Sequence, residues 1–247
     1  MKAFSKMLKI EFKLSVRDMN MPIFAVIFPI IVAVILGLIY GGKPAFEGAE
    51  YTFFAQSFGA ISSIGICAAG VMGLPLVLAD YRNKKILKRF KVTPVSPAVI
   101  LFVQVAVNFI MSVISLVLVY TISVTFFGYH IQGSITSFLG SYLLVLISIY
   151  SLGMLVAAVS PNTNTSNLLC CILYFPMLIF SGATLPYEVM PTTLQKVANI
   201  MPLTQGIKLL KGTSLGLPMD NILLPIIVMA ALSVICIGIS IRFFRWE

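Results

Sequence analysis

The sequence predicts an all-α integral membrane protein, folded as a single domain over residues 1–247, that crosses the bilayer six times. Hydrophobic residues make up 59% of the chain and charged residues only 10%, whereas a soluble domain has about 25% charged residues. The mean hydropathy of +1.03 agrees with this composition. So little polar surface cannot cover an exterior that faces water.

Six apolar segments approach the roughly 20 residues that a helix needs to cross the hydrocarbon core. The fifth is the weakest, because it opens with the polar residues Asn164 to Asn167. The predicted spans are Pro22–Tyr40, Phe53–Leu78, Val99–Phe127, Ile135–Val159, about Asn164–Phe180, and Ile222–Ile241.

Residues 1–21 precede the first span and predict an interfacial helix. Basic residues recur there at spacings of three to four, which places them on one side of a helix, where they can face anionic lipid headgroups. Glu11 and Asp18 fall opposite this stripe, among apolar positions. They are either solvated charges or form a salt bridge with the polar loop after the second span or with a partner protein. The basic stripe consists of Lys2, Lys6, Lys9, Lys13 and Arg17.

The distribution of positive charge predicts the orientation. Most of the 17 Lys and Arg residues lie in the N-terminal segment, in the loop after the second span and at the C-terminus. Cytosolic loops carry the excess of Lys and Arg, so we expect both termini and residues 79–98 in the cytosol. The outer side has only Lys43, Lys196, Lys208 and Lys211.

None of the predicted spans contains Asp, Glu, Lys, Arg or His. Such residues are kept in membranes where protons, ions or substrates are handled, so the sequence argues against a proton-driven transporter, an intramembrane metalloprotease and a voltage sensor. We expect no catalytic residue and no metal site, and the four cysteines lie in apolar runs that indicate packing. If the chain moves a cargo uphill, the free energy comes from outside it.

Two kinds of residue inside the spans leave alternatives open. The small residues around Gly70 and Gly153 permit close helix contact, either within one subunit or between subunits. Gln104, Asn108 and the aromatic residues near Phe54 and Phe58 fit either a cavity or ordinary packing.

The most polar stretch, "DYRNKKILKRFKVTPVS", runs from Asp80 to Ser96. We expect a short cytosolic helix from Asp80 to Lys91, ended by Thr93-Pro94 and Ser96-Pro97. Its basic and apolar side chains fit lipid headgroups or a cytosolic protein, and its position between two spans disfavours nucleic acid.

Residues 181–212 form the second distinctive segment, on the predicted outer side. Pro186, Pro191 and Pro202 divide it into pieces too short to cross the membrane, yet it is too apolar for a free loop. Broken helices that enter and leave the outer leaflet satisfy both observations. We therefore expect a re-entrant helical segment before the last span.

Together these two segments resemble the type-2 ABC exporter permease family, in which a "tPvs" element follows a charged cytosolic helix and a Pro-rich block precedes the last span. With the basic leader and six spans, the resemblance covers essentially the whole chain. The chain departs from the family at Asn83, Lys85-Ile86 and Lys88, where members often have acidic and Gly-Thr residues. The matching residues are Thr93-Pro94-Val95-Ser96, Gly182, Pro186, Met190-Pro191, Leu194 and Met201-Pro202-Leu203-Thr204.

The resemblance implies the membrane half of an ATP-driven exporter in the plasma membrane of a prokaryote. Two copies of a cytosolic ABC ATPase would bind ATP and Mg, and a second permease, identical or paralogous, would complete the complex. The chain itself would hold no cofactor. The residues expected to contact the ATPase are Asp80, Arg82, Lys84, Lys85, Leu87, Lys88, Arg89, Phe90, Thr93 and Pro94, and those of an outer gate are Gly182, Pro186, Glu188, Pro191 and Pro202.

The absence of charge in the spans suits a hydrophobic or amphipathic cargo, such as a drug, an antibiotic or a lipopeptide. A glycan or a lipid-linked polymer is the alternative cargo. A membrane anchor or assembly protein that transports nothing is the alternative of a different class, and a passive channel is disfavoured because no charged ring runs through the spans.

Overall fold

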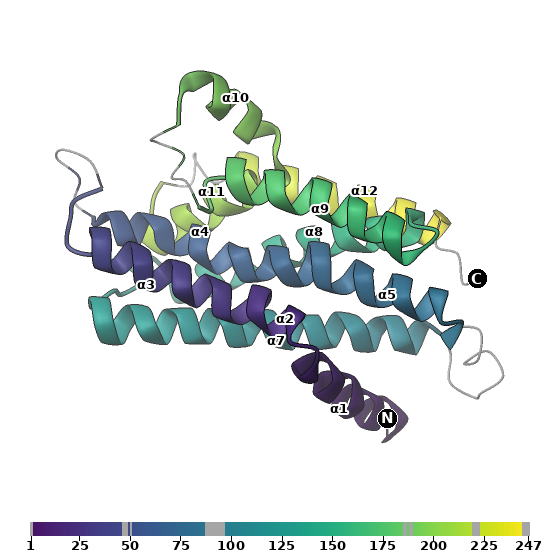
Figure 1. Ribbon diagram of the computed structural model, residues 1–247. Coiled ribbons are helices and arrows are strands. Elements are labelled where there is room, and N and C mark those ends of the chain that lie inside the picture. The colour runs from purple at the N-terminus through teal and green to yellow at the C-terminus, as the bar shows by residue number, and fades with distance from the viewer. Residues whose placement is uncertain are drawn as a thin grey trace.

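The computed structural model describes residues 2–45, 49, 51–86, 97–184, 187, 190–218 and 223–243. These residues form helices and, apart from one isolated bridge between Pro44 and Thr52, no β-structure. The long helices run side by side, and α1 and the last turn of α12 lie at the same end of the bundle (Figure 1). The helices are α1 (Lys2–Arg17), α2 (Asn20–Pro22), η1 (Ile23–Ile27), α3 (Phe28–Tyr40), α4 (Phe53–Cys67), η2 (Ala68–Gly73), α5 (Leu74–Asn83), α7 (Pro97–Phe127), α8 (Ile135–Val159), α9 (Thr163–Phe180), α10 (Thr192–Ile200), α11 (Pro202–Leu215) and α12 (Leu223–Phe243).

Six helical stretches are long and apolar enough to cross a membrane, which confirms the predicted spans. Four of them match the predicted bounds closely, and the last runs to Phe243 instead of Ile241. The second is wrong at its end, because the helix continues through Asn83 and does not stop at Leu78. Asp80 and Arg82 therefore belong to the spanning helix α5.

Two π-helical segments, η1 and η2, interrupt the first and second spans. Each lies just before a proline, Pro29 near the start of α3 and Pro75 near the start of α5. A proline has no N–H and its ring clashes with the carbonyl four residues earlier, and a widened turn lets the helix continue past it. The two π-helical segments contact each other across the bundle.

Small residues bring the second and fourth spans into backbone contact. A Cβ atom on Gly153 of α8 would overlap the carbonyl oxygen of Gly70 in η2. At Gly65 of α4 a Cβ atom would lie 2.6 Å from Ser115 Oγ and 2.9 Å from the Ala25 carbonyl oxygen. At these positions the small residues serve packing within one subunit.

Aromatic residues fill the core at the end of the bundle away from the chain termini. Phe58 of α4 packs against Tyr129, with ring centroids 4.5 Å apart, and against Phe138 of α8 at 5.7 Å. Phe54 packs against Phe127 of α7 at 5.0 Å. Both Phe54 and Phe58 are fully buried, so packing is the role that the structure gives them.

The segment before the last span is broken into two short helices, α10 and α11, as predicted. Pro191 directly precedes α10 and Pro202 is the first residue of α11, a position where the missing N–H of proline costs nothing. α10 lies apart from the long helices (Figure 1), whereas α11 is largely buried and packs against α4, α8 and α12. Gly182 has a left-handed backbone with φ of 91°, and Pro186 and Glu188 lie outside the described residues.

Candidate functional site at the basic end of the bundle

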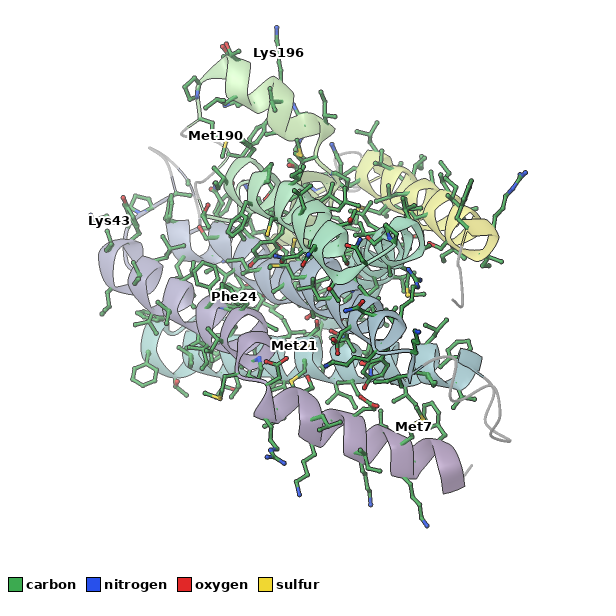
Figure 2. The ribbon with its side chains drawn as sticks, turned by 45° about the vertical axis from the view of Figure 1, so that its right-hand side comes forward. Met7, Met21, Phe24, Lys43, Met190 and Lys196 are labelled. Atoms are coloured by element: carbon green, nitrogen blue, oxygen red, sulfur yellow. The ribbon has the colours of Figure 1, made fainter. Side chains whose placement is uncertain are left out.

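The basic end of the bundle is the end that carries α1, the end of α5, the start of α7 and the turn between α8 and α9. On α1 the side chains at Lys6, Lys9, Lys13 and Arg17 are exposed. Nitrogen-tipped side chains of α1 point away from the bundle (Figure 2). The other side of α1, which includes Glu11, is half-buried and packs against α7. The predicted amphipathic helix is present.

The polar segment begins as the last turn of α5, so the expected independent helix from Asp80 is wrong at its start. Lys84 Nζ lies 2.8 Å from Asp80 Oδ2 in an i,i+4 ion pair. Lys85 has φ of 55°, a left-handed conformation that ends helices. The remaining residues expected in the coupling helix lie outside the described part of the chain: Leu87, Lys88, Arg89, Phe90, Thr93 and Pro94.

Tyr81 joins three helices through the carboxylate of Glu11. The Tyr81 hydroxyl donates to Glu11 Oε2 at 2.5 Å, and Gln104 Nε2 of α7 donates to the same oxygen at 2.8 Å. Hydrogen bonds to a charged acceptor are stronger than those between neutral groups. Glu11 is thus bonded to uncharged donors, and one of them, Tyr81, belongs to the polar stretch after the second span. Among the described residues Glu11 is therefore neither a free solvated charge nor part of a salt bridge.

Arg82 joins α5 to the turn between α8 and α9. Its side chain is only 8% exposed, and its Nη1 donates to the carbonyl oxygen of Ser160. Ser160 caps the end of α8, where unsatisfied carbonyls carry partial negative charge and favour a cation. Arg82 was expected among the contacts for the ATPase, and that contact stays a prediction. Within this subunit its side chain is buried and positions the end of α5 against α8.

The adjacent residues Tyr81 and Arg82 therefore connect the end of α5 with α1, α7 and α8. The connecting groups are partly or fully buried and hydrogen-bonded. Among the described residues no group of three or more His, Cys, Asp or Glu side chains lies close enough to hold a metal ion.

Sequence reasoning missed Tyr81, Gln104 and Ser160 as members of this site. Gln104 was noticed as a polar residue in a span, but its partner was not assigned. The sequence did hold a signal for this contact. Gln104 is a polar residue near the end of a span and Glu11 is a carboxylate on the apolar side of the leader helix, and buried polar groups need hydrogen-bond partners.

The family model for ABC-2 type transporters matches residues 2–215. This chain belongs to the ABC-2 type transporter family. The match includes the whole basic end and both broken helices α10 and α11, and only the last span, α12, lies beyond it. The family consists of transporter membrane subunits that are not themselves catalytic.

Several curated proteins are similar to part of this ABC-2 chain. Nodulation protein J of Rhizobium leguminosarum bv. viciae is 36% identical over 93 residues, which cover 38% of this chain and 34% of that protein. Nodulation protein J of Neorhizobium galegae is 32% identical over 94 residues, with the same coverage. That of Rhizobium meliloti (strain 1021) is 30% identical over 95 residues, 38% of this chain and 36% of the relative. The similarity thus spans about a third of the length of these relatives.

Replacing Tyr81 with Phe is expected to loosen α1. The substitution removes the hydroxyl donor to Glu11 and keeps the ring, so it should lower the free energy of unfolding by about 1.5–3 kcal/mol, the usual contribution of a hydrogen bond to a charged group. It should also increase the mobility of a spin label placed at Lys9 on α1. Tyr40→Phe, at the other end of the bundle, is the control. Unchanged mobility in Tyr81→Phe would contradict the role assigned to this hydrogen bond.

Proposed function

We propose that this chain is the membrane-spanning subunit of an ATP-driven exporter, and that a separate ATPase docks on the chain that follows Asn83. ABC-2 permeases normally work with an ATPase subunit. The observation that carries the proposal is the pair of connections at Tyr81 and Arg82. They make the end of α5 a place where movement of an outside partner can reach the spanning helices.

In the proposed cycle, ATP binding closes the ATPase dimer and moves the segment after Asn83. Tyr81 then shifts α1 and α7 through Glu11 and Gln104, and Arg82 shifts the end of α8 through Ser160. The π-helical segment η2 lies directly before α5, and widened turns of this kind occur often at functional sites. It would absorb the rotation of α5 while α4 stays packed in the aromatic core.

The exit path in this proposal is closed at the opposite end by α10, α11 and the turn at Gly182. Two permease chains, identical or paralogous, would enclose the path, and both chain termini would lie in the cytosol of a prokaryotic cell. The cargo we propose is hydrophobic or amphipathic. This choice is supported by the spans, whose charged residues in the described chain are confined to their ends, at Asp80, Arg82 and Arg242.

An alternative function is a membrane anchor that transports nothing. The exposed basic residues of α1 favour it, because such a stripe binds anionic headgroups without any partner. The hydrogen-bonded end of α5 favours the exporter, because an anchor does not need these connections between helices.

Co-purification from the native host separates the two functions. After solubilisation in a mild detergent, the exporter proposal expects an ATPase subunit in stoichiometric amount with this chain, and ATP hydrolysis faster than that of the ATPase alone. The chain recovered alone, with no hydrolysis above background under the same conditions that preserve a known ABC complex, would favour the anchor.

A further inference from the structure

A polar pocket lies at the end of the bundle opposite the basic end, between α4, the turn after α9 and α11. Its volume is about 320 Å³, at the small end of the range of ligand pockets. The polar residues that line it are Gln56, Ser57, Ser181, Thr204, Lys208 and Lys211.

Three buried polar atoms of these lining residues have no hydrogen-bond partner within the described chain. They are Gln56 Oε1, Ser181 Oγ and Thr204 Oγ1, on side chains that are 6%, 1% and 1% exposed. A buried polar group without a partner costs about 1–3 kcal/mol, so nearly all such groups in native proteins are satisfied. Three of them around one pocket call for polar partners that the described chain does not supply.

The positively charged side chains that line the pocket indicate a negatively charged ligand. Lys208 and Lys211 of α11 line the pocket, and none of the described lining residues is acidic. Lys208 Nζ lies 2.6 Å from Asn199 Oδ1 and 5.0 Å from the centre of the Tyr187 ring, so the described residues that hold it in place are uncharged. Burial lowers the pKa of this ammonium, which lies outside the six spans, and a nearby anion would favour its charged form.

We propose that this pocket binds a phosphate group that carries hydroxyl groups beside it, as in glycerol phosphate. The ammonium groups and the hydroxyls of Ser181 and Thr204 would donate to phosphate oxygens. Gln56 Oε1 can only accept a hydrogen bond, so it calls for a donor, and a hydroxyl of the glycerol supplies one. The recognition groups all belong to this chain, so binding can be tested without a transport assay, and a failed binding test would leave the proposed export function standing.

Ligand-induced stabilisation of the purified chain tests the proposal, because a ligand that binds the folded state raises its unfolding temperature. In dodecyl maltoside micelles, phosphatidylglycerol should raise the unfolding midpoint more than phosphatidylcholine, whose choline neutralises the phosphate charge and which lacks the free glycerol hydroxyls. Lys208→Gln should need about tenfold more phosphatidylglycerol for the same rise. Lys196→Gln, on α10 where Figure 2 shows the side chain pointing away from the bundle, should behave as wild type.

Glycerol 1-phosphate distinguishes the sources of the ligand. If it reproduces the stabilisation, a soluble phosphate suffices, and if only phosphatidylglycerol does, the ligand is a lipid headgroup. Equal stabilisation by the two lipids, or an unchanged response in Lys208→Gln, would overturn the proposal.

Thr204→Val provides a second variant whose two effects have opposite signs. Removing the orphan hydroxyl should raise the midpoint of the lipid-free protein by about 2–4 °C and should diminish the further rise produced by phosphatidylglycerol. A Thr204→Val protein that keeps the full lipid response would contradict the assigned site even if Lys208→Gln had weakened binding by disturbing Asn199 and Tyr187.

Discussion

Gly153→Ala is expected to cost at least about 3 kcal/mol of folding free energy, above the usual range for overpacking a core. The added methyl would occupy the place of the Gly70 carbonyl oxygen, and that oxygen is backbone and cannot rotate away. The second and fourth spans would have to separate. Because α5 follows η2 directly, the separation would also displace Tyr81 and Arg82 from their partners.

A matched control for this substitution lies on the same helix. At Gly140 of α8 a Cβ atom would meet nothing within 4 Å, so Gly140→Ala should leave stability unchanged or raise it slightly, as alanine favours helices. The stability of both variants is measured by heating each protein in detergent and recording the loss of its monodisperse size-exclusion peak. A Gly153→Ala protein as stable as Gly140→Ala would show that the close contact between η2 and α8 is absent.

Phe58→Ala is the second substitution with a large expected effect, about 3–5 kcal/mol, because a fully buried ring is deleted from a packed core. Phe58 contacts Tyr120, Tyr129 and Phe138 with ring centroids 6.0, 4.5 and 5.7 Å away. These rings come from α7, α8 and the loop between them, so the cavity would loosen several helices at once.

Phe126→Ala on α7 is the control for that prediction, since this ring is 77% exposed. It should cost little, because an exposed ring in a detergent micelle gives up few protein contacts. Unfolding temperatures of the two variants should therefore differ widely, and similar values would mean that the aromatic residues at Phe58 are not closely packed.

Much of the fold could be predicted because the bilayer imposes a simple length rule. Apolar runs gave the spans, and Pro191 and Pro202 gave the break between α10 and α11. The rule fails at the end of α5, because hydropathy detects where a helix leaves the hydrocarbon core of the bilayer and not where the helix itself ends. Asp80 to Asn83 remain helical beyond the apolar run, and only the structure reveals their partners.

The candidate site was harder to predict, because its contacts join distant parts of the chain. Tyr81 and Gln104 are 70 and 93 residues from Glu11 in sequence. Arg82 looked like one more member of a basic loop, and nothing in its neighbours distinguishes it from Lys84. Likewise, α11 was expected as part of a re-entrant segment, but the sequence did not show which helices it packs against, and most of its length is buried.

The central claim is that an ATPase docks on the chain after Asn83 and moves it when ATP binds. The most direct measurement is the ATPase activity of the partner subunit, alone and with this permease reconstituted in liposomes. A fourfold variant of the permease should abolish the stimulation while the permease stays folded. It combines Lys84→Glu, Lys85→Glu, Lys88→Glu and Arg89→Glu. Lys43→Glu with Lys196→Glu, on the opposite end, should preserve the stimulation. Full stimulation by the fourfold variant would contradict the account.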